Sequence, residues 1–166
     1  MELPVQNYLP PFLTKLNPKS RVLVAGLNAL EDQGFFIRNG HVSEVLDPFQ
    51  KNLLLWTPKE GSLSHVWLNQ TLNLFPSEQS QRMVASLFKG MEKGSWLGLF
   101  LREGEGTYTE GFFDTLGVQD ANESRKIYLY SEKAICSLLE QTGFSVVQLG
   151  RNPQFQGMML ILAKRI

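Results

Sequence analysis

The chain has 166 residues, 43% of them hydrophobic, and its 16 lysines and arginines balance 16 aspartates and glutamates. This composition excludes a disordered or fibrous protein, and the length is enough for a domain with its own core. A net charge of zero gives no electrostatic reason to expect nucleic acid or an anionic membrane as a partner. Without net repulsion, a homo-oligomer or a protein partner stays open. We expect a single domain over residues 1–166.

The chain contains one cysteine, Cys136, so it cannot form an intrachain disulfide, and this is typical of a reducing compartment. Residues 1–11 lack the basic and apolar regions of a secretory signal. No run of about 18 apolar residues is present to span a membrane. The expected location is the cytoplasm.

Short apolar runs alternate with segments of helical periodicity along the chain. The predicted strands cover residues 21–26, 41–47, 53–56, 65–68, 96–101, 144–149 and 158–163, and helices are predicted from Asn28 to Asn39, from a cap at Ser77, and from a cap at Ser131 to Gly143. Residues 102–124 are rich in Gly, Thr, Asp and Asn, and are expected to form a long polar loop. This order predicts an α/β fold, a Rossmann-like three-layer α/β/α sandwich. Its sheet is mostly parallel, with a C-terminal antiparallel hairpin.

A glycine and an acid end the first two predicted strands. Gly26 closes the first strand, and Asp47 closes the second about 20 residues later. In α/β folds a glycine turn lets the backbone approach a ligand, and a carboxylate after the next strand holds a ribose. The pair therefore indicates a nucleotide-type cofactor. The alternatives are a strand-ending glycine and a turn aspartate before Pro48.

Further segments resemble the class I S-adenosylmethionine-dependent methyltransferases of the small-molecule type. The similar segments are VWLNQTLNLFP at 66–76, MEKGSWL at 91–97, REGEG at 102–106, and the stretch from Tyr128 through Ser131 to Phe144. The resemblance covers residue 9 to the end and is most specific in the C-terminal half. It implies S-adenosylmethionine as cofactor, a small molecule as substrate and methyl transfer as the activity.

The resemblance also implies roles for individual residues. The implied cofactor-binding set is Gly26 at the first glycine of the cofactor turn, Asn28 at the second, Asp32 at the helix start, Asp47 at the ribose, and Leu68 and Asn69 facing the methionine end. No catalytic residue is implied, because methyl transfer from a sulfonium depends mainly on positioning and exclusion of water.

The cofactor motif departs from the family pattern and the chain is shortened. Val24 replaces the acid that meets the methionine ammonium, and Asn28 and Leu30 replace the second and third glycines. Five residues separate Asp47 from the run at 53–56, which is too few for a parallel crossover. The adenine-covering helix is therefore expected to be missing, and the third strand to pair antiparallel or to lie outside the sheet.

Two functions from different classes follow. The first is a methyltransferase, and the second is a non-catalytic relative that keeps the scaffold as a binding or assembly module. The absence of a Gly-x-Gly-x-x-Gly turn counts against a Rossmann-like nucleotide binder of another type. The methyltransferase requires that Asp47 points into the cofactor space. The binding module is favoured if Leu30, Phe35 or Trp56 fills that space.

Other chemistry-bearing residues have plainer interpretations. Glu103 and Glu105 could act as a general base or orient a substrate amine, although a solvated loop is favoured. His41 and His65 lack metal-like spacing with Cys136, so no metal is expected. Cys136 is interpreted as a buried, inert thiol. Five aromatic residues could line a substrate pocket or pack the excursion onto the core: Tyr108, Phe112, Phe113, Tyr128 and Tyr130.

Overall fold

A computed structural model describes residues 8–46, 57–113 and 119–166. The elements in chain order are α1 (Pro10–Leu13), β1 (Arg21–Gly26), α2 (Ala29–Arg38), β2 (Val42–Leu46), β3 (His65–Asn69), a short 3-10 helix (Leu72–Leu74), α3 (Ser77–Gly90), β4 (Trp96–Arg102), β5 (Thr107–Phe113), β6 (Gln119–Tyr128), α4 (Glu132–Thr142), β7 (Phe144–Gly150) and β8 (Met158–Arg165).

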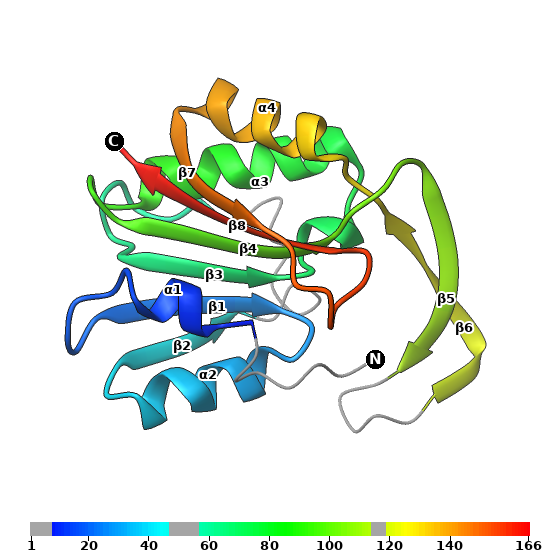
Figure 1. Ribbon diagram of the computed structural model, residues 1–166, viewed down its shortest axis with the longest axis horizontal. Coiled ribbons are helices and arrows are strands. Elements are labelled where there is room, and N and C mark those ends of the chain that lie inside the picture. The colour runs from blue at the N-terminus through cyan, green and yellow to red at the C-terminus, as the bar shows by residue number, and fades with distance from the viewer. Residues whose placement is uncertain (1–7, 47–56, 114–118) are drawn as a thin grey trace.

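The main sheet has six described strands in the order β2-β1-β3-β4-β8-β7 (Figure 1). Strands β2, β1, β3 and β4 run parallel, with Val24 opposite Val45 on one side and Trp67 on the other. Strand β8 is antiparallel to both β4 and β7. The predicted mostly parallel sheet with a C-terminal antiparallel pair is confirmed.

Helices cover both faces of this sheet, which confirms the predicted three layers (Figure 1). On one face, α3 and α4 bury Leu87 and Ile135 against Leu99 and its neighbours on the central strands. On the other face, α1 and α2 bury Phe12 and Phe36, and the Phe12 ring lies 5.2 Å from the indole of Trp67. Apolar residues alternate in direction along each strand, so both faces are supplied with core.

The caps of the last two helices differ in how they match the sequence. At α4, Ser131 Oγ accepts a hydrogen bond from the Ala134 N–H at 3.1 Å, as predicted. At α3, the predicted Ser77 cap is wrong, because Ser77 is the first helical residue and Pro76 occupies the capping position. Proline carries no side-chain acceptor, so no side chain caps α3.

The expected polar loop after β4 is instead a β-hairpin. Strands β5 and β6 form a separate two-stranded antiparallel sheet beside the main one (Figure 1). Its register pairs Thr107 with Tyr128 and Glu110 with Arg125. The composition indicated polarity correctly, but the ladder satisfies the backbone groups that a loop would leave to water. Ile127 on β6 is fully buried.

Three features of the sequence analysis lie outside the described residues. They are Asp47, the predicted strand at 53–56 and Trp56. Within the described sheet, β2 is the edge strand next to β1.

Candidate functional site

The turn from β1 into α2 keeps the backbone conformation that glycine usually provides. Gly26 has φ of 109° and Asn28 has φ of 57°, so both residues lie at positive φ. Asparagine adopts the left-handed region more readily than other non-glycine residues. The turn therefore has the left-handed conformation at Asn28 although this residue is not a glycine.

Gly26 packs directly against the end of β3. A Cβ atom at Gly26 would lie 1.9 Å from the carbonyl oxygen of Asn69 and 2.5 Å from Thr71 Oγ1. The following N–H, that of Leu27, donates to the same Asn69 carbonyl at 3.0 Å. Glycine is thus required here by a contact within the protein, with or without a ligand.

The two bulky replacements in the glycine motif point in different directions. Leu30 is 71% exposed, so it does not fill the space between the turn and the sheet. Val24 is fully buried in the core beneath α1 and α2, and Phe35 packs partly buried on the same core. Of the three side chains that could block the cofactor space, Leu30 therefore does not, and Trp56 lies outside the described residues.

Asp32 is buried in a hydrogen-bonded cluster at the start of α2. Its Oδ1 accepts from the Tyr8 hydroxyl at 2.7 Å, and its Oδ2 accepts from Trp67 Nε1 at 2.9 Å and Asn69 Nδ2 at 3.0 Å. Asn69 Nδ2 also donates to the Tyr8 oxygen at 3.1 Å. Asp32 is the one fully buried charged side chain in the described part of the chain.

Burial sets the protonation of this cluster. It raises the pKa of Asp32 to about 6, and the three hydrogen bonds oppose the shift only in part. Burial, followed by the charge of Asp32, raises the pKa of Tyr8 well above its ordinary range. Asp32 therefore titrates near neutral pH while Tyr8 stays protonated. Both oxygens of the Asp32 carboxylate accept hydrogen bonds from side chains of the protein.

The residues at the end of β3 divide between the two faces of the sheet. Leu68 is buried in the core beneath α3 and α4, so its side chain faces away from the Asp32 cluster. The Asn69 side chain lies in that cluster. The structure brings together Gly26, Asn28, Asp32 and Asn69 from the implied cofactor-binding set. It separates the Leu68 side chain from them.

A second polar cluster lies at the ends of β3 and β4, and Tyr108 is the one member that the sequence analysis named, as possible pocket lining. Arg102, the last residue of β4, donates through Nε to Gln70 Oε1 at 2.7 Å and through Nη1 to Glu110 Oε2 at 2.6 Å and to the Tyr108 hydroxyl. Its Nη2 donates to Glu110 Oε1 at 3.3 Å. Glu110 Oε1 also accepts from Arg125 Nε at 3.2 Å.

The two clusters are joined through adjacent residues of the chain. Gln70 follows Asn69, and its Nε2 donates to Asn69 Oδ1 at 3.2 Å. Gln70 has φ of 55°, and its N–H donates to the Phe100 carbonyl at 2.6 Å, so its backbone is held on β4. One hydrogen-bonded chain therefore runs from Asp32 on α2 to the β5–β6 hairpin, across the carboxyl ends of β3 and β4.

The charges of the second cluster stabilise each other. Burial acts most strongly on both groups and opposes charge, lowering the pKa of Arg102 and raising that of Glu110, but their mutual interactions outweigh it. The net result is a raised pKa for Arg102 and a lowered pKa for Glu110. Both side chains are therefore charged at neutral pH.

Sequence signals for the residues that were missed are weak. Gln70 and Arg102 each stand just after or at the end of a buried strand, which is where α/β sites form. Tyr8 and Trp67 carry no such signal. Their contacts with Asp32 span 24 and 35 residues, and only the fold brings them together.

The paired acidic residues at the start of the excursion behave as solvated charges. Glu103 accepts two hydrogen bonds from Arg151, each at 2.6 Å, and hydrogen bonding to Arg151 is the largest cause of the lowered pKa of Glu103. A general base at neutral pH needs a raised pKa. Glu105 is exposed. The favoured interpretation of a solvated segment fits both residues better than catalysis does.

The two histidines and the cysteine serve the scaffold. Nδ1 of His41 accepts from the Ser20 N–H at 3.1 Å, and Nδ1 of His65 accepts from the Trp96 N–H at 2.9 Å. Cys136 is partly exposed, so the prediction of a buried thiol is wrong. Burial and two nearby glutamates raise the pKa of Cys136, which keeps it a thiol.

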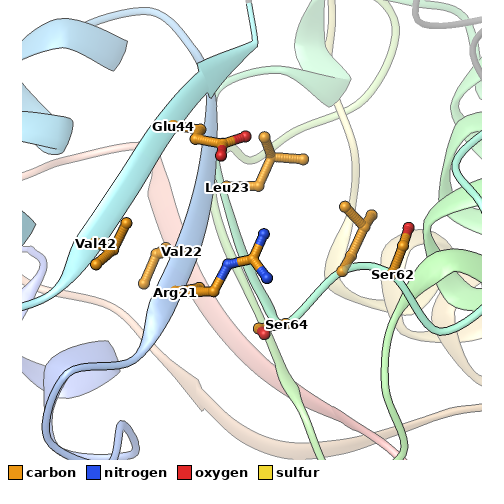
Figure 2. A pocket seen from close by; sticks show the side chains of 8 residues that line it. Arg21, Val22, Leu23, Val42, Glu44, Ser62 and Ser64 are labelled. Atoms are coloured by element: carbon orange, nitrogen blue, oxygen red, sulfur yellow. The ribbon is translucent and has the colours of Figure 1, made fainter.

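A small hollow lies at the opposite edge of the sheet from the Gly26 turn. Figure 2 shows it at the starts of β1 and β2, with the side chains of Arg21, Glu44 and Ser64 around it. Its volume is about 30 Å³, which is room for very few water molecules. Ligands of α/β sheets bind at the carboxyl ends of the strands. The hollow therefore lies away from the edge at which such ligands bind.

Across residues 8–46, 57–113 and 119–166, no group of three or more His, Cys, Asp or Glu side chains is placed to hold a metal ion. No helix in these ranges has the length and apolar character to cross a membrane.

Comparison with solved structures supports the fold over nearly the whole chain. A protein from Methanosarcina mazei, described as a SAM-dependent methyltransferase, matches 100% of this chain and 99% of its own, with a TM-score of 0.69 and 13% identity. The 1,6-didemethyltoxoflavin-N1-methyltransferase of Burkholderia thailandensis was solved with S-adenosylhomocysteine. It matches 94% of this chain and 74% of its own, with a TM-score of 0.67 and 16% identity.

A third structure, from Rhodobacter sphaeroides and described as a putative Zn-dependent alcohol dehydrogenase, matches 94% of this chain and 87% of its own, with a TM-score of 0.71 and 14% identity. No protein-family model and no curated protein matches the sequence. These likenesses are all too low in identity to transfer an activity, so they show a shared fold.

Proposed function

The chain has the fold of the class I S-adenosylmethionine-dependent methyltransferases, and we propose that it binds this cofactor and transfers its methyl group to a small molecule. The observation that carries the proposal is the β1–α2 turn. It keeps positive φ at both Gly26 and Asn28 while Leu30 points to solvent, so the altered motif retains an open turn. We also propose that the chain works as a single domain.

The fit of the cofactor to the residues present rests on backbone groups and one acid. No side chain caps the start of α2, so the first N–H groups of this helix are available to a polar ligand. Asp47 is proposed to hold the ribose hydroxyls. Asp32 and Asn69 support the turn from behind, because their polar atoms bond to each other and to the core.

The cofactor supplies an electrophilic methyl group, and the chain supplies position. We propose that the carboxyl edge of β1, β3 and β4 holds the acceptor close to that methyl and excludes water. The substrate class draws on the small-molecule methyltransferase among the similar structures. No general base is assigned, since Glu103 has a lowered pKa.

A non-catalytic binding module is the second candidate. It is favoured by the side chains of Tyr8, Asp32 and Asn69 next to the turn, which all form hydrogen bonds with one another inside the protein. In addition, Val24 offers no carboxylate to the methionine ammonium. A module that has lost its cofactor could keep this cluster to stabilise the turn.

Titration calorimetry with S-adenosylmethionine and S-adenosylhomocysteine separates the two candidates. We expect micromolar binding, about −8 kcal/mol. The Asp47→Ala variant removes the acceptor of two charge-assisted hydrogen bonds, so we expect it to weaken binding by about 100-fold.

The matched control is Glu44→Ala on β2, whose exposed side chain lies beside the hollow at the far edge of the sheet. It is expected to bind like the unaltered protein. Absence of heat with either ligand, for a protein shown to be folded, would rule out the methyltransferase and leave the binding module.

A further inference from the structure

Arg102 lies at the carboxyl end of a central strand, the edge of the sheet at which α/β folds bind their ligands. It ends β4 at the carboxyl edge and is joined through Gln70 to Asn69. Its side chain is 17% exposed, so its charge is largely withdrawn from water yet still reachable. A guanidinium in such a place needs an anion beside it.

The anion now beside Arg102 comes from a different structural unit. Glu110 belongs to β5, and the β5–β6 hairpin forms a sheet separate from the one that holds Arg102 (Figure 1). The guanidinium makes a two-pronged contact with the Glu110 carboxylate, at 2.6 Å and 3.3 Å. This planar fork is the geometry by which arginine recognises any carboxylate.

Glu110 has a second cationic partner within its own hairpin. Arg125 lies opposite Glu110 in the β5–β6 register, and its Nη2 is 3.2 Å from Glu110 Oε1. Glu110 can therefore leave Arg102 and keep a charged neighbour. Gln70, whose backbone is held on β4, keeps its bond to Arg102 Nε during such an exchange, so the guanidinium stays oriented.

We propose that Arg102 is the binding group for a carboxylate of a small-molecule ligand, and that Glu110 occupies this position when the ligand is absent. The exchange of one carboxylate for another leaves the charge around Arg102 unchanged. A neutral ligand would leave Arg102 without a counter-charge, so it cannot displace Glu110. This assignment rests on the proposed function. If the chain is a methyltransferase, the methyl acceptor is a molecule that carries a carboxylate.

A titration without cofactor tests the site by itself. Benzoate is added to the full-length protein, benzamide serves as the uncharged control, and the Nε–Hε NMR signal of Arg102 is followed. The signal is assigned by its loss in Arg102→Lys. We expect benzoate to shift this signal to saturation and benzamide to leave it in place.

Two variants locate the competing group. In Glu110→Gln the internal carboxylate is gone, so benzoate is expected to bind about tenfold more tightly than to the unaltered protein. Glu105→Gln removes an exposed carboxylate from the preceding turn and is expected to bind as the unaltered protein does.

The remaining variants keep the test decisive if Glu110→Gln does not fold. Arg102→Lys keeps the charge but loses the fork, so calorimetry should show benzoate binding weakened by at least tenfold, whereas the remote Arg82→Gln should not change it. Equal responses to benzoate and benzamide, or equal affinities in Arg102→Lys and the unaltered protein, would overturn the proposal.

The outcome for the cofactor is independent of this result. Benzoate binding at Arg102 together with failure to bind S-adenosylmethionine would support the carboxylate site and reject the methyltransferase. Binding of S-adenosylmethionine without any response to benzoate would support the methyltransferase and reject the carboxylate site.

Discussion

Replacing Gly26 by alanine is expected to destabilise the protein by more than about 4 kcal/mol, the range reached by few single substitutions. The added Cβ would lie 1.9 Å from the Asn69 carbonyl oxygen, and Gly26 and Asn69 are partners in the ladder that pairs β1 with β3. Neither can move without breaking the ladder. In addition, φ of 109° is unfavourable for any L-residue with a side chain. Urea unfolding followed by circular dichroism measures the loss.

The matched control is Gly40→Ala, which shares the positive φ but not the crowding. Gly40 has φ of 86°, and no atom lies within 4 Å of its Cβ position. The expected cost is about 1–2 kcal/mol from the backbone conformation alone. Equal losses in the two variants would contradict a steric role for Gly26. It would then be retained for ligand approach only, and its variant would lose cofactor binding instead of stability.

The contribution of Asp32 to stability is expected to decrease as the pH rises from about 4 to above 6. The pKa of Asp32 is about 6 in the folded protein, against an ordinary value of 3.8, so the folded state binds its proton more tightly than the unfolded state does. The stabilisation is fully present below the unfolded pKa and is lost as the pH passes the folded pKa. The shift of about two units corresponds to about 3 kcal/mol.

The measurement compares urea unfolding of the unaltered protein and Asp32→Asn at several values between pH 4 and pH 7.5. Asparagine cannot ionise, so the difference between the two unfolding free energies isolates Asp32. We expect that difference to fall by about 3 kcal/mol across the range. A difference that is constant or that rises with pH would mean that the cluster stabilises the charged form.

A Tyr8→Phe variant identifies the cause of the transition. It keeps the ring, which stacks on Phe100 at 4.6 Å, but removes the hydroxyl that donates to Asp32 Oδ1. That hydrogen bond lowers the pKa of Asp32, so its removal should move the fall in stability to higher pH. A transition at unchanged pH would exclude this hydroxyl as a partner of the carboxylate.

Asp32 also bears on how the turn between β1 and α2 is held in place. Val24 pairs with Trp67 in the sheet, and the Trp67 indole donates to Asp32. Position 24 thus carries no carboxylate, while a buried carboxylate from the following helix lies on the same face of the sheet. This carboxylate holds the end of β3 and the Tyr8 segment together. The titration of Asp32 and the cofactor titration together test whether that support serves binding.

The sequence by itself determined the six described strands of the main sheet, helices α2 to α4, and their order. The strands at 21–26, 65–68 and 96–101 and the helix from Ser131 to Gly143 were predicted within a few residues of their observed bounds. Each rests on local information: an uninterrupted apolar run, a helical repeat, or a capping residue. The parallel sheet followed from their alternation.

Local information failed where the same residues allow more than one structure. Residues 102–124 were expected to form a loop because they are polar, yet most of them pair in a hairpin. Ser77 was expected to cap α3, yet that helix begins one residue earlier than a Ser77 cap would place it, at Ser77 itself, with Pro76 in the capping position. Polarity does not specify whether backbone groups bond to water or to a neighbouring strand.

Only the tertiary structure decided which side chains form the site. Sequence analysis identified Gly26, Asn28 and Asp32 individually, but it contained nothing to join Asp32 to Tyr8 or Gln70 to Arg102. The partners are 24 and 32 residues apart. They meet because parallel strands end at one edge of the sheet, where buried polar groups must find partners among whatever side chains the topology places beside them.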